Sequence, residues 1–158
     1  YYFGKKEHVE QWKIYYPKRS DYRFIGNIST KTIQGYRQLP KNGKLLVITK
    51  SLKDCACLYG MGIPACAPQS ETQFISNTIL EDLRQRFDKI VLLFDSDLTG
   101  IHYTNVLRRK YDFLIPCIIP RRYGAKDISD FYKKYGRKGT IKFIKESIKY
   151  IKEWERHS

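Results

Sequence analysis

A stretch near the middle of the chain, residues 89–100, limits most strongly what the sequence can fold into. It reads Lys-Ile-Val-Leu-Leu-Phe-Asp-Ser-Asp-Leu-Thr-Gly, so five consecutive apolar residues run directly into Asp95 and Asp97. A short run of branched and aromatic residues is typical of a strand buried on both faces. The acids then lie at the carboxyl end of that strand, where open α/β sheets bind ligands, and could hold a hard divalent cation. Alternatively, they only shape the turn and cap the next helix.

Other apolar segments extend this pattern in both directions. Strands are expected at 45–49, 63–67, 90–94 and 113–119, the last broken at Pro116 and so favoured for a sheet edge. Helices are expected at about 55–59, 72–86 and 99–110. Strands that alternate with helices predict an α/β fold with a mainly parallel sheet of about four strands and right-handed crossovers.

All strand carboxyl ends of such a sheet share one edge, which gathers polar residues from distant parts of the sequence. These are Lys50, Ser51, Glu71, Asp95, Asp97 and Asp127. One neighbouring acid, Asp54, has a structural explanation, because Ser51 followed three residues later by an acid is a variant of the capping box. The convergence of the other residues is harder to explain by turn chemistry alone.

Three segments are expected along the chain. Residues 1–43 form a β-rich lead-in, residues 44–136 the α/β domain, and residues 137–158 an amphipathic helix that follows a short helix ended by Gly136. In the lead-in, two short strands within 12–28 flank a polar turn. Their aromatic residues are interleaved with Lys13, Lys18, Arg19 and Arg23. They either form a basic stacking surface for single-stranded nucleic acid or pack a small sheet, and both interpretations stay open.

The charge balance indicates a polyanionic partner, with nucleic acid as the first candidate. The 158 residues include 30 Lys and Arg against 16 Asp and Glu, a formal charge of +14. The sequence has neither a membrane-spanning run nor a signal peptide, and its four cysteines lie in apolar segments without zinc-ligand spacing. We therefore expect a protein of the reducing cytoplasm with buried, unbridged cysteines. The start at Tyr1 rather than Met indicates a piece of a longer protein.

The ordered motifs resemble the TOPRIM domain of DNA primases, topoisomerases and some nucleases. The matching pieces are the strand 45–49 with Asp54 behind it, the D-S-D of residues 95–97 with Gly100 behind it, and the K-D-I-S-D of residues 126–130. They cover roughly residues 44–136. Segment 48–54 and the lead-in over residues 12–27 are most similar to phage primases, within a group that includes the bacterial-type enzymes.

This resemblance implies a primase that extends an RNA primer on a single-stranded DNA template from nucleoside triphosphates in phage DNA replication. It implies Mg²⁺ or Mn²⁺ as cofactor, a replicative helicase as a possible partner, no membrane, and the host cytoplasm for a phage protein. The expected catalytic residues are Asp95, Asp97, Glu71 and Lys50. The expected metal ligands are Asp95, Asp97, Asp127 and Glu71. The residues expected to bind nucleotide or nucleic acid are Lys50, Lys53, Asp54, Arg121, Arg122, Lys126 and Arg23.

One position departs from the family pattern. The family places a glutamate, thought to act as acid or base, directly after the first strand, where this chain has Lys50. Either the site is impaired or another residue supplies the carboxylate, and Glu71 is the candidate. A buried ammonium needs an acid partner. We therefore expect Lys50 to lie within salt-bridge distance of Glu71, with Asp54 as the other available acid.

Two further functions remain open. The same acids could activate water in a metal-dependent nuclease, for which His102 is the only histidine near the site, although a solvent-facing helix residue is expected there. A non-enzymatic nucleic-acid-binding module is the third possibility, because Lys50 removes a carboxylate.

Overall fold

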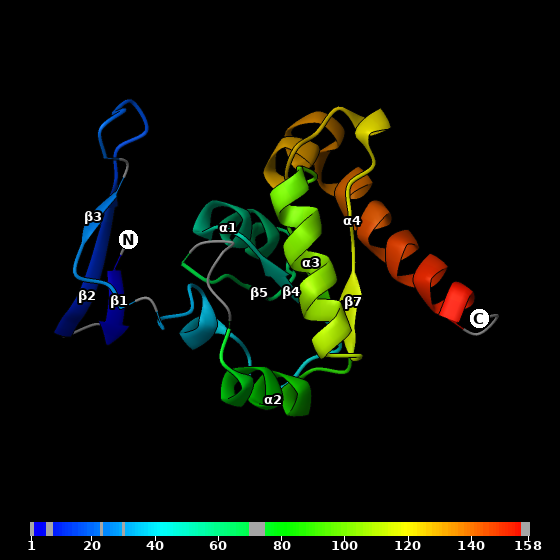
Figure 1. Cartoon of the computed structure of the whole chain (residues 1–158), viewed down its shortest axis with the longest axis horizontal. Helices are drawn as coiled ribbons and strands as arrows, with labels where there is room; N and C mark the ends of the chain where they lie inside the picture. Colours follow the sequence, from blue (N-terminus) through cyan, green and yellow to red (C-terminus); the bar gives the residue numbers. More distant parts are fainter. Residues whose placement is uncertain (1, 6–7, 23, 30, 70–74, 156–158) are drawn as a thin grey trace. The chain divides into compact units, whose positions relative to one another are not determined.

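The structure is a computed structural model that describes residues 2–5, 8–22, 24–29, 31–69 and 75–155. The chain divides into two compact units, Tyr1–Thr32 and Ile33–Ser158. Figure 1 shows a small sheet in the first unit and a larger α/β arrangement in the second.

The first unit contains an antiparallel sheet with the strand order β1-β2-β3. Its strands are β1 (Tyr2–Lys5), β2 (His8–Tyr15) and β3 (Phe24–Gly26). The two strands predicted around a polar turn correspond to β2 and β3, whereas β1 was not expected, because its short sequence YFGK lacks a clear alternation. Gly26 permits the close pairing of β2 and β3, because a Cβ there would lie 2.2 Å from the Trp12 carbonyl oxygen.

The second unit contains a four-stranded sheet with the order β5-β4-β6-β7, and every pair in it is parallel. Its strands are β4 (Leu46–Thr49), β5 (Ala65–Cys66), β6 (Ile90–Leu93) and β7 (Leu114–Pro116). The predicted α/β class, parallel sheet and edge position of the proline-containing strand are confirmed. Proline has no N–H to donate, and β7 ends at Pro116 on the sheet edge.

In the described part of the chain, four α-helices flank this sheet. They are α1 (Leu52–Gly60), α2 (Asn77–Arg86), α3 (Leu98–Lys110) and α4 (Ile128–Glu155). Short 3₁₀ turns, η1 (Tyr36–Gln38) and η2 (Arg121–Tyr123), precede β4 and α4. The predicted start of the second helix at residue 72 is wrong. The Ser76 hydroxyl caps α2 by accepting from the Ile79 N–H, so the apolar Ile75 precedes the helix. Residues 72–74 lie outside the described part.

A glycine interrupts the last helix where the sequence predicts a break. Gly136 has φ 66° and ψ −178°, a conformation that favours glycine, and it separates two helical parts within α4. The second part carries Phe143, Ile144 and Ile148 on its buried side. The predicted amphipathic character of this part is therefore confirmed.

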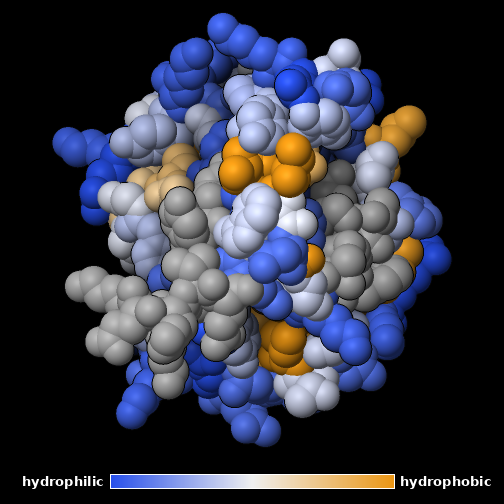
Figure 2. All heavy atoms as spheres, turned by 90° about the vertical axis from the view of Figure 1, so that its left-hand side faces the viewer, coloured by the Kyte–Doolittle hydropathy of each residue, from blue (hydrophilic) through white to orange (hydrophobic). Residues whose placement is uncertain are grey.

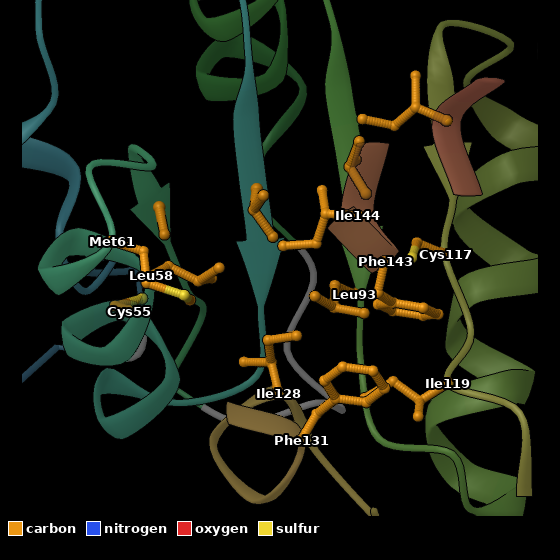
Figure 3. Packing of buried hydrophobic residues seen from close by; sticks show 14 of the residues in the cluster. Cys55, Leu58, Met61, Leu93, Cys117, Ile119, Ile128, Phe131, Phe143 and Ile144 are labelled. Atoms are coloured by element: carbon orange, nitrogen blue, oxygen red, sulfur yellow. The ribbon is translucent and has the colours of Figure 1, made fainter. Parts of the chain in front are cut away.

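The alternation of side chains along β4 and β6 divides the core between the two faces of the sheet. Val47, Val91 and Leu93 face one cluster with residues of α1 and α4, whereas Leu46, Ile48, Ile90 and Leu92 face another with residues of α2 and α3. Figure 3 shows Phe131 and Phe143 of α4 beside Leu93 and Ile119, and the two rings stack at 4.7 Å. Both faces are thus covered, as expected for a parallel sheet.

The cysteines are unbridged, as predicted. Cys55, Cys66 and Cys117 are buried and Cys57 is partly buried. Burial raises the pKa of Cys66 to about 12 and of Cys117 to about 11, so these thiols stay protonated at neutral pH. They act as small core residues.

The face drawn in Figure 2 is mostly hydrophilic, with hydrophobic residues in separate small groups. Within the described part of the chain, no helix combines the length and the apolar composition needed to cross a membrane.

Candidate active site

The site residues come together at the carboxyl edge of the sheet, because β4 and β6 end at the same level there. Thr49 pairs with Leu93, so Lys50 and the segment leading to Asp95 emerge side by side. A backbone hydrogen bond of 3.1 Å from the Ser96 N–H to the Lys126 carbonyl oxygen then ties this segment to the loop before α4. The predicted convergence of Lys50 with Asp95 is confirmed, and Lys126 lies at the same edge.

Asp95 is the buried centre of this edge, with only 2% of its surface exposed. Its Oδ2 accepts a hydrogen bond from Lys50 Nζ and lies 3.4 Å from Lys126 Nζ. Its Oδ1 is buried and finds no hydrogen-bond partner in the described part of the chain, and the same holds for the neighbouring Ser96 Oγ. Because buried polar atoms are nearly always paired, these two atoms are the ones at this edge whose hydrogen bonding a ligand or water would complete.

Asp97 is both a helix cap and an accessible carboxylate. Its Oδ1 accepts a 2.9 Å hydrogen bond from the Gly100 N–H at the start of α3, so the part of the structural alternative in which Asp97 caps this helix is confirmed. Its Oδ2 lies 3.6 Å from Lys126 Nζ. The Gly100 N–H and then the nearby Lys126 and Lys50 hold the pKa of Asp97 below its ordinary value, although burial opposes this shift. The carboxylate is therefore ionised at neutral pH and half-open to solvent.

Lys126 links the two acids. Its ammonium lies between Asp95 and Asp97, and the charge of Asp95 is the main influence that raises the pKa of Lys126. The Lys126 side chain is 59% exposed. A flexible, exposed cation therefore occupies the position between two carboxylates, from which another cation could displace it.

Asp127 pairs with a different lysine. Its Oδ2 lies 2.7 Å from Lys53 Nζ, and its Oδ1 caps α4 by accepting from the Asp130 N–H at 2.8 Å. Burial raises the pKa of Asp127, but the hydrogen bonds from Lys53 and Asp130 outweigh it and hold that pKa below its ordinary value. Asp127 thus fixes Lys53 at the edge and begins α4.

Asp54 is fully buried and bonded to two hydroxyl groups. The Ser51 hydroxyl donates to its Oδ2 at 2.7 Å and the Ser129 hydroxyl to its Oδ1 at 2.6 Å. The predicted capping box at Ser51 is confirmed, because the Asp54 N–H also donates to the Ser51 hydroxyl oxygen. Asp54 therefore joins α1 to α4 and has no surface with which to touch nucleic acid.

The pKa of Asp54 gives a pH-dependence prediction. Burial is the main influence and raises this pKa, although the hydrogen bonds from Ser129 and Ser51 lower it. The unfolded chain then loses the Asp54 proton at a lower pH than the folded chain. Stability that comes from Asp54 is complete below the ordinary carboxyl pKa and falls as the pH rises through the folded pKa.

The measurement is urea unfolding of the wild type and Asp54→Asn, at pH values from below the ordinary carboxyl pKa to above the raised pKa of Asp54 in the folded chain. The stability of the wild type relative to Asp54→Asn should decrease as the pH rises, because the amide does not titrate. Asp88→Asn, an exposed residue in the turn before β6, is the control and should leave the pH dependence unchanged. A constant difference between wild type and Asp54→Asn would contradict the raised pKa.

The two arginines of the basic loop lie at different hollows. Arg121 lines an open hollow of about 430 Å³ together with Ser96, Asp97 and Lys126. Arg122 lines a different hollow, together with Pro116 and Glu146, and its guanidinium lies over the Tyr123 ring. Arg121 is therefore placed beside Asp97, whereas Arg122 is not part of that hollow.

Several expectations receive no structural description or a different partner. Glu71 and Arg23 lie outside the described residues, and so does the expected pairing of Lys50 with Glu71. The described partner of Lys50 is Asp95, and Asp54 is bonded to serines.

His102 is exposed and contacts the Tyr103 ring. Ser96 and Ser129 were not predicted as site residues, although their positions within D-S-D and K-D-I-S-D were a usable signal.

Two carboxylates are available for a metal ion. Within the described residues no three His, Cys, Asp or Glu side chains form a group placed to hold one. Mg²⁺, however, is commonly bound by one or two carboxylates with waters and substrate phosphates. Asp95 and Asp97 fit this set, because a single ammonium already lies near both and Asp95 Oδ1 has no partner in the described part.

No protein-family model matches the chain, and a search of curated proteins finds no significant match. Solved structures do match. The primase fragment of the bacteriophage T7 primase-helicase protein aligns with 93% of this chain and 60% of its own, at 15% identity and a TM-score of 0.60. The Aquifex aeolicus primase, with its zinc-binding and RNA polymerase domains, aligns with 87% of this chain and 37% of its own, at 16% identity and a TM-score of 0.64.

A third match lies in a structure of the bacteriophage T7 lagging-strand DNA polymerase interacting with primase domains bound to an RNA/DNA hybrid and dTTP. It covers 81% of this chain and 65% of the other, at 15% identity and a TM-score of 0.60. This chain thus spans between 37% and 65% of the length of these three relatives. The likeness establishes the fold: the chain has the TOPRIM-like fold of phage and bacterial primase domains, as the motifs predicted.

Proposed function

We propose that this chain, with its primase-like fold, carries out nucleotidyl transfer and extends RNA primers on a single-stranded DNA template during DNA replication. The observation that carries the proposal is the pair Asp95 and Asp97 at the carboxyl edge of the sheet, surrounded by lysines. Carboxylates alone would repel nucleotide and nucleic acid. The lysines at the same edge offset that repulsion and can hold phosphates.

In this proposal Asp95 and Asp97 would hold Mg²⁺ or Mn²⁺, and the ion would displace Lys126, which lies near both carboxylates. The ion would lower the pKa of the attacking 3′-hydroxyl and neutralise charge on the triphosphate. Lys126, whose side chain is 59% exposed, could then turn toward a triphosphate oxygen. Asp97 accepts from the Gly100 N–H through Oδ1, which leaves Oδ2, now beside Lys126, to bind the ion.

The remaining cations bind phosphate around the acids. Lys53 is held at the edge by Asp127, with its own side chain 56% exposed, and Arg121 lines the hollow beside Asp97. Arg122, in the neighbouring hollow, would contact a more distant part of the template. Asp127 and Asp54 position these groups. Glu71 as a further acid and Arg23 as a further cation remain predictions.

The first unit offers a surface for the template. Tyr15 and Phe24 stack at 4.9 Å while 43% and 49% exposed, and Lys13 Nζ lies 4.1 Å from the Phe24 ring centre. Arg19 lies over the rings of Tyr16 and Tyr22. Exposed aromatic rings beside cations are typical of surfaces that bind single-stranded nucleic acid by stacking.

The partners follow from this reaction. They are single-stranded DNA, nucleoside triphosphates and the RNA primer, and the site of action is the cytoplasm where these occur. A replicative helicase is a further proposed partner, supported by the primase-helicase among the structural relatives.

Primer synthesis with labelled nucleotides on single-stranded template tests the proposal. RNA product that requires template and divalent cation supports it, whereas shortened template indicates the nuclease. Lys50 on Asp95 specifically favours a second candidate, a nucleic-acid-binding module without catalysis, because it occupies a carboxylate oxygen. A gel shift with neither product nor cleavage would indicate that module.

The salt dependence of DNA binding tests the basic loop. Replacing Arg121 and Arg122 with alanine should reduce the slope of log affinity against log salt by about 0.7 for each phosphate that the loop no longer neutralises. Arg108→Ala with Arg109→Ala, in the last turn of α3, is the matched control and should leave the slope nearly unchanged. An unchanged slope in the loop variant would mean that the loop is solvated and contacts no phosphate of the bound DNA.

A further inference from the structure

The buried carboxylate of Asp95 forms an ion pair with Lys50 of the same chain. Lys50 Nζ donates to Asp95 Oδ2, and the side chains of Lys50 and Asp95 are only 23% and 1% exposed. Lys126 approaches the same oxygen from a side chain that is 59% exposed. Lys126 can therefore move into solvent, whereas moving Lys50 would leave a buried carboxylate with less compensation, which is unfavourable.

We propose that Lys50 takes the place of a second divalent cation, so that the site holds a single ion, between Asp95 and Asp97. This inference rests on the proposed function, because it concerns the same reaction site. Sites with two ions place them about 3.5–4 Å apart, with shared ligands. Here Lys50 occupies Asp95 Oδ2, and the described residues contain no group of three acids, histidines or cysteines at this edge.

The charge of Lys50 also disfavours the binding of a second divalent ion. A fixed ammonium on one carboxylate oxygen repels a second divalent ion that approaches it, and it neutralises part of the charge that such an ion would otherwise neutralise. An ammonium cannot lower the pKa of a bound hydroxyl as a metal ion does. Lys50 therefore supplies charge compensation and the position of Asp95, while activation of the hydroxyl depends on the single ion.

The test counts ions directly, without nucleotide, by following free Mn²⁺ in an electron paramagnetic resonance titration of the whole chain. The wild type should bind one Mn²⁺. Lys50→Met should bind one Mn²⁺ about tenfold more tightly, because the adjacent positive charge is gone. Lys50→Glu, which adds a carboxylate and frees Asp95 Oδ2, should bind two.

Lys89→Met is the matched control, since Lys89 precedes β6 at the opposite end of the strand from Asp95. It removes the same charge and should bind Mn²⁺ as the wild type does. Thermal melting with and without Mn²⁺ accompanies each titration. If Lys50→Glu fails to fold without metal, the Mn²⁺ affinity of Lys50→Met relative to that of Lys89→Met tests the role of Lys50.

The possible failures are distinguishable. Two Mn²⁺ ions in the wild type, or unchanged number and affinity in Lys50→Met, would overturn the role of Lys50 and leave the proposed function standing. Primer synthesis by a wild type that binds no Mn²⁺ would also overturn it. A wild type that neither binds Mn²⁺ nor makes primers would overturn the proposed function and this inference together.

Discussion

Asp97→Asn should reduce primer synthesis by about a hundredfold or more while leaving the fold intact. Asparagine caps a helix as well as aspartate, so the hydrogen bond from the Gly100 N–H can persist. The substitution removes the negative charge that the ion and Lys126 require. The free energy of unfolding should change by no more than about 1 kcal/mol, the size of a charge effect at a helix start.

The measurement is product formed per unit time on single-stranded template, with thermal melting of the same sample. Asp112→Asn is the matched control, because Asp112 is an exposed acid just beyond the other end of α3. It makes the same chemical change and should retain full activity. Full activity in Asp97→Asn would remove this carboxylate from the reaction site.

Gly100→Ala should lower the free energy of unfolding by about 3 kcal/mol and should also abolish the activity of the site. A Cβ at position 100 would lie 2.2 Å from the Asp95 carbonyl oxygen and 2.9 Å from its backbone nitrogen. Backbone atoms cannot rotate away as a flexible side chain can, so α3 or the Asp95 segment must shift. A displacement of about 1 Å can cost a hundredfold in rate.

Gly60→Ala is the control for this substitution. Gly60 ends α1, and a Cβ there would meet nothing within 4 Å. It should leave stability unchanged or raise it by up to about 1 kcal/mol, because alanine restricts the unfolded chain. Urea unfolding of both variants checks the pair, and equal stabilities would mean that α3 does not pack on Asp95 as closely as described.

The central part of the fold was predictable because its signals are strong and independent. The apolar runs of β4 and β6 end in polar residues, and helical spacing fills the segments between strands. The N-terminal strand β1 gives no such signal, since four residues with a glycine have no usable period. The start of α2 was placed too early because apolar spacing continues through Ile75, before the Ser76 cap.

The gathering of Lys50 and Asp95 at one edge of the sheet was predictable from the sequence, but the ion pair between them was not. In the order β5-β4-β6-β7, β4 has a neighbour on each side, so the residue after it can meet the loop after β5 or the segment after β6. The expected pairing of Lys50 with Glu71 corresponds to the first arrangement. The level register of Thr49 with Leu93 brings Lys50 to Asp95, and neither strand's sequence specifies this register. The pairing of Lys50 with Glu71 lies outside the described residues and stays a prediction.

Localising the metal ion tests the central claim most directly. Crystals of the chain soaked with Mn²⁺ should give one anomalous peak between the Asp95 and Asp97 carboxylates, with the Lys126 ammonium displaced from its position near both. The same soak of Asp97→Asn should lose the peak. A peak elsewhere on the chain, or an ordered Lys126 ammonium between the acids at saturating Mn²⁺, would contradict the assignment of this edge as a metal-dependent reaction site.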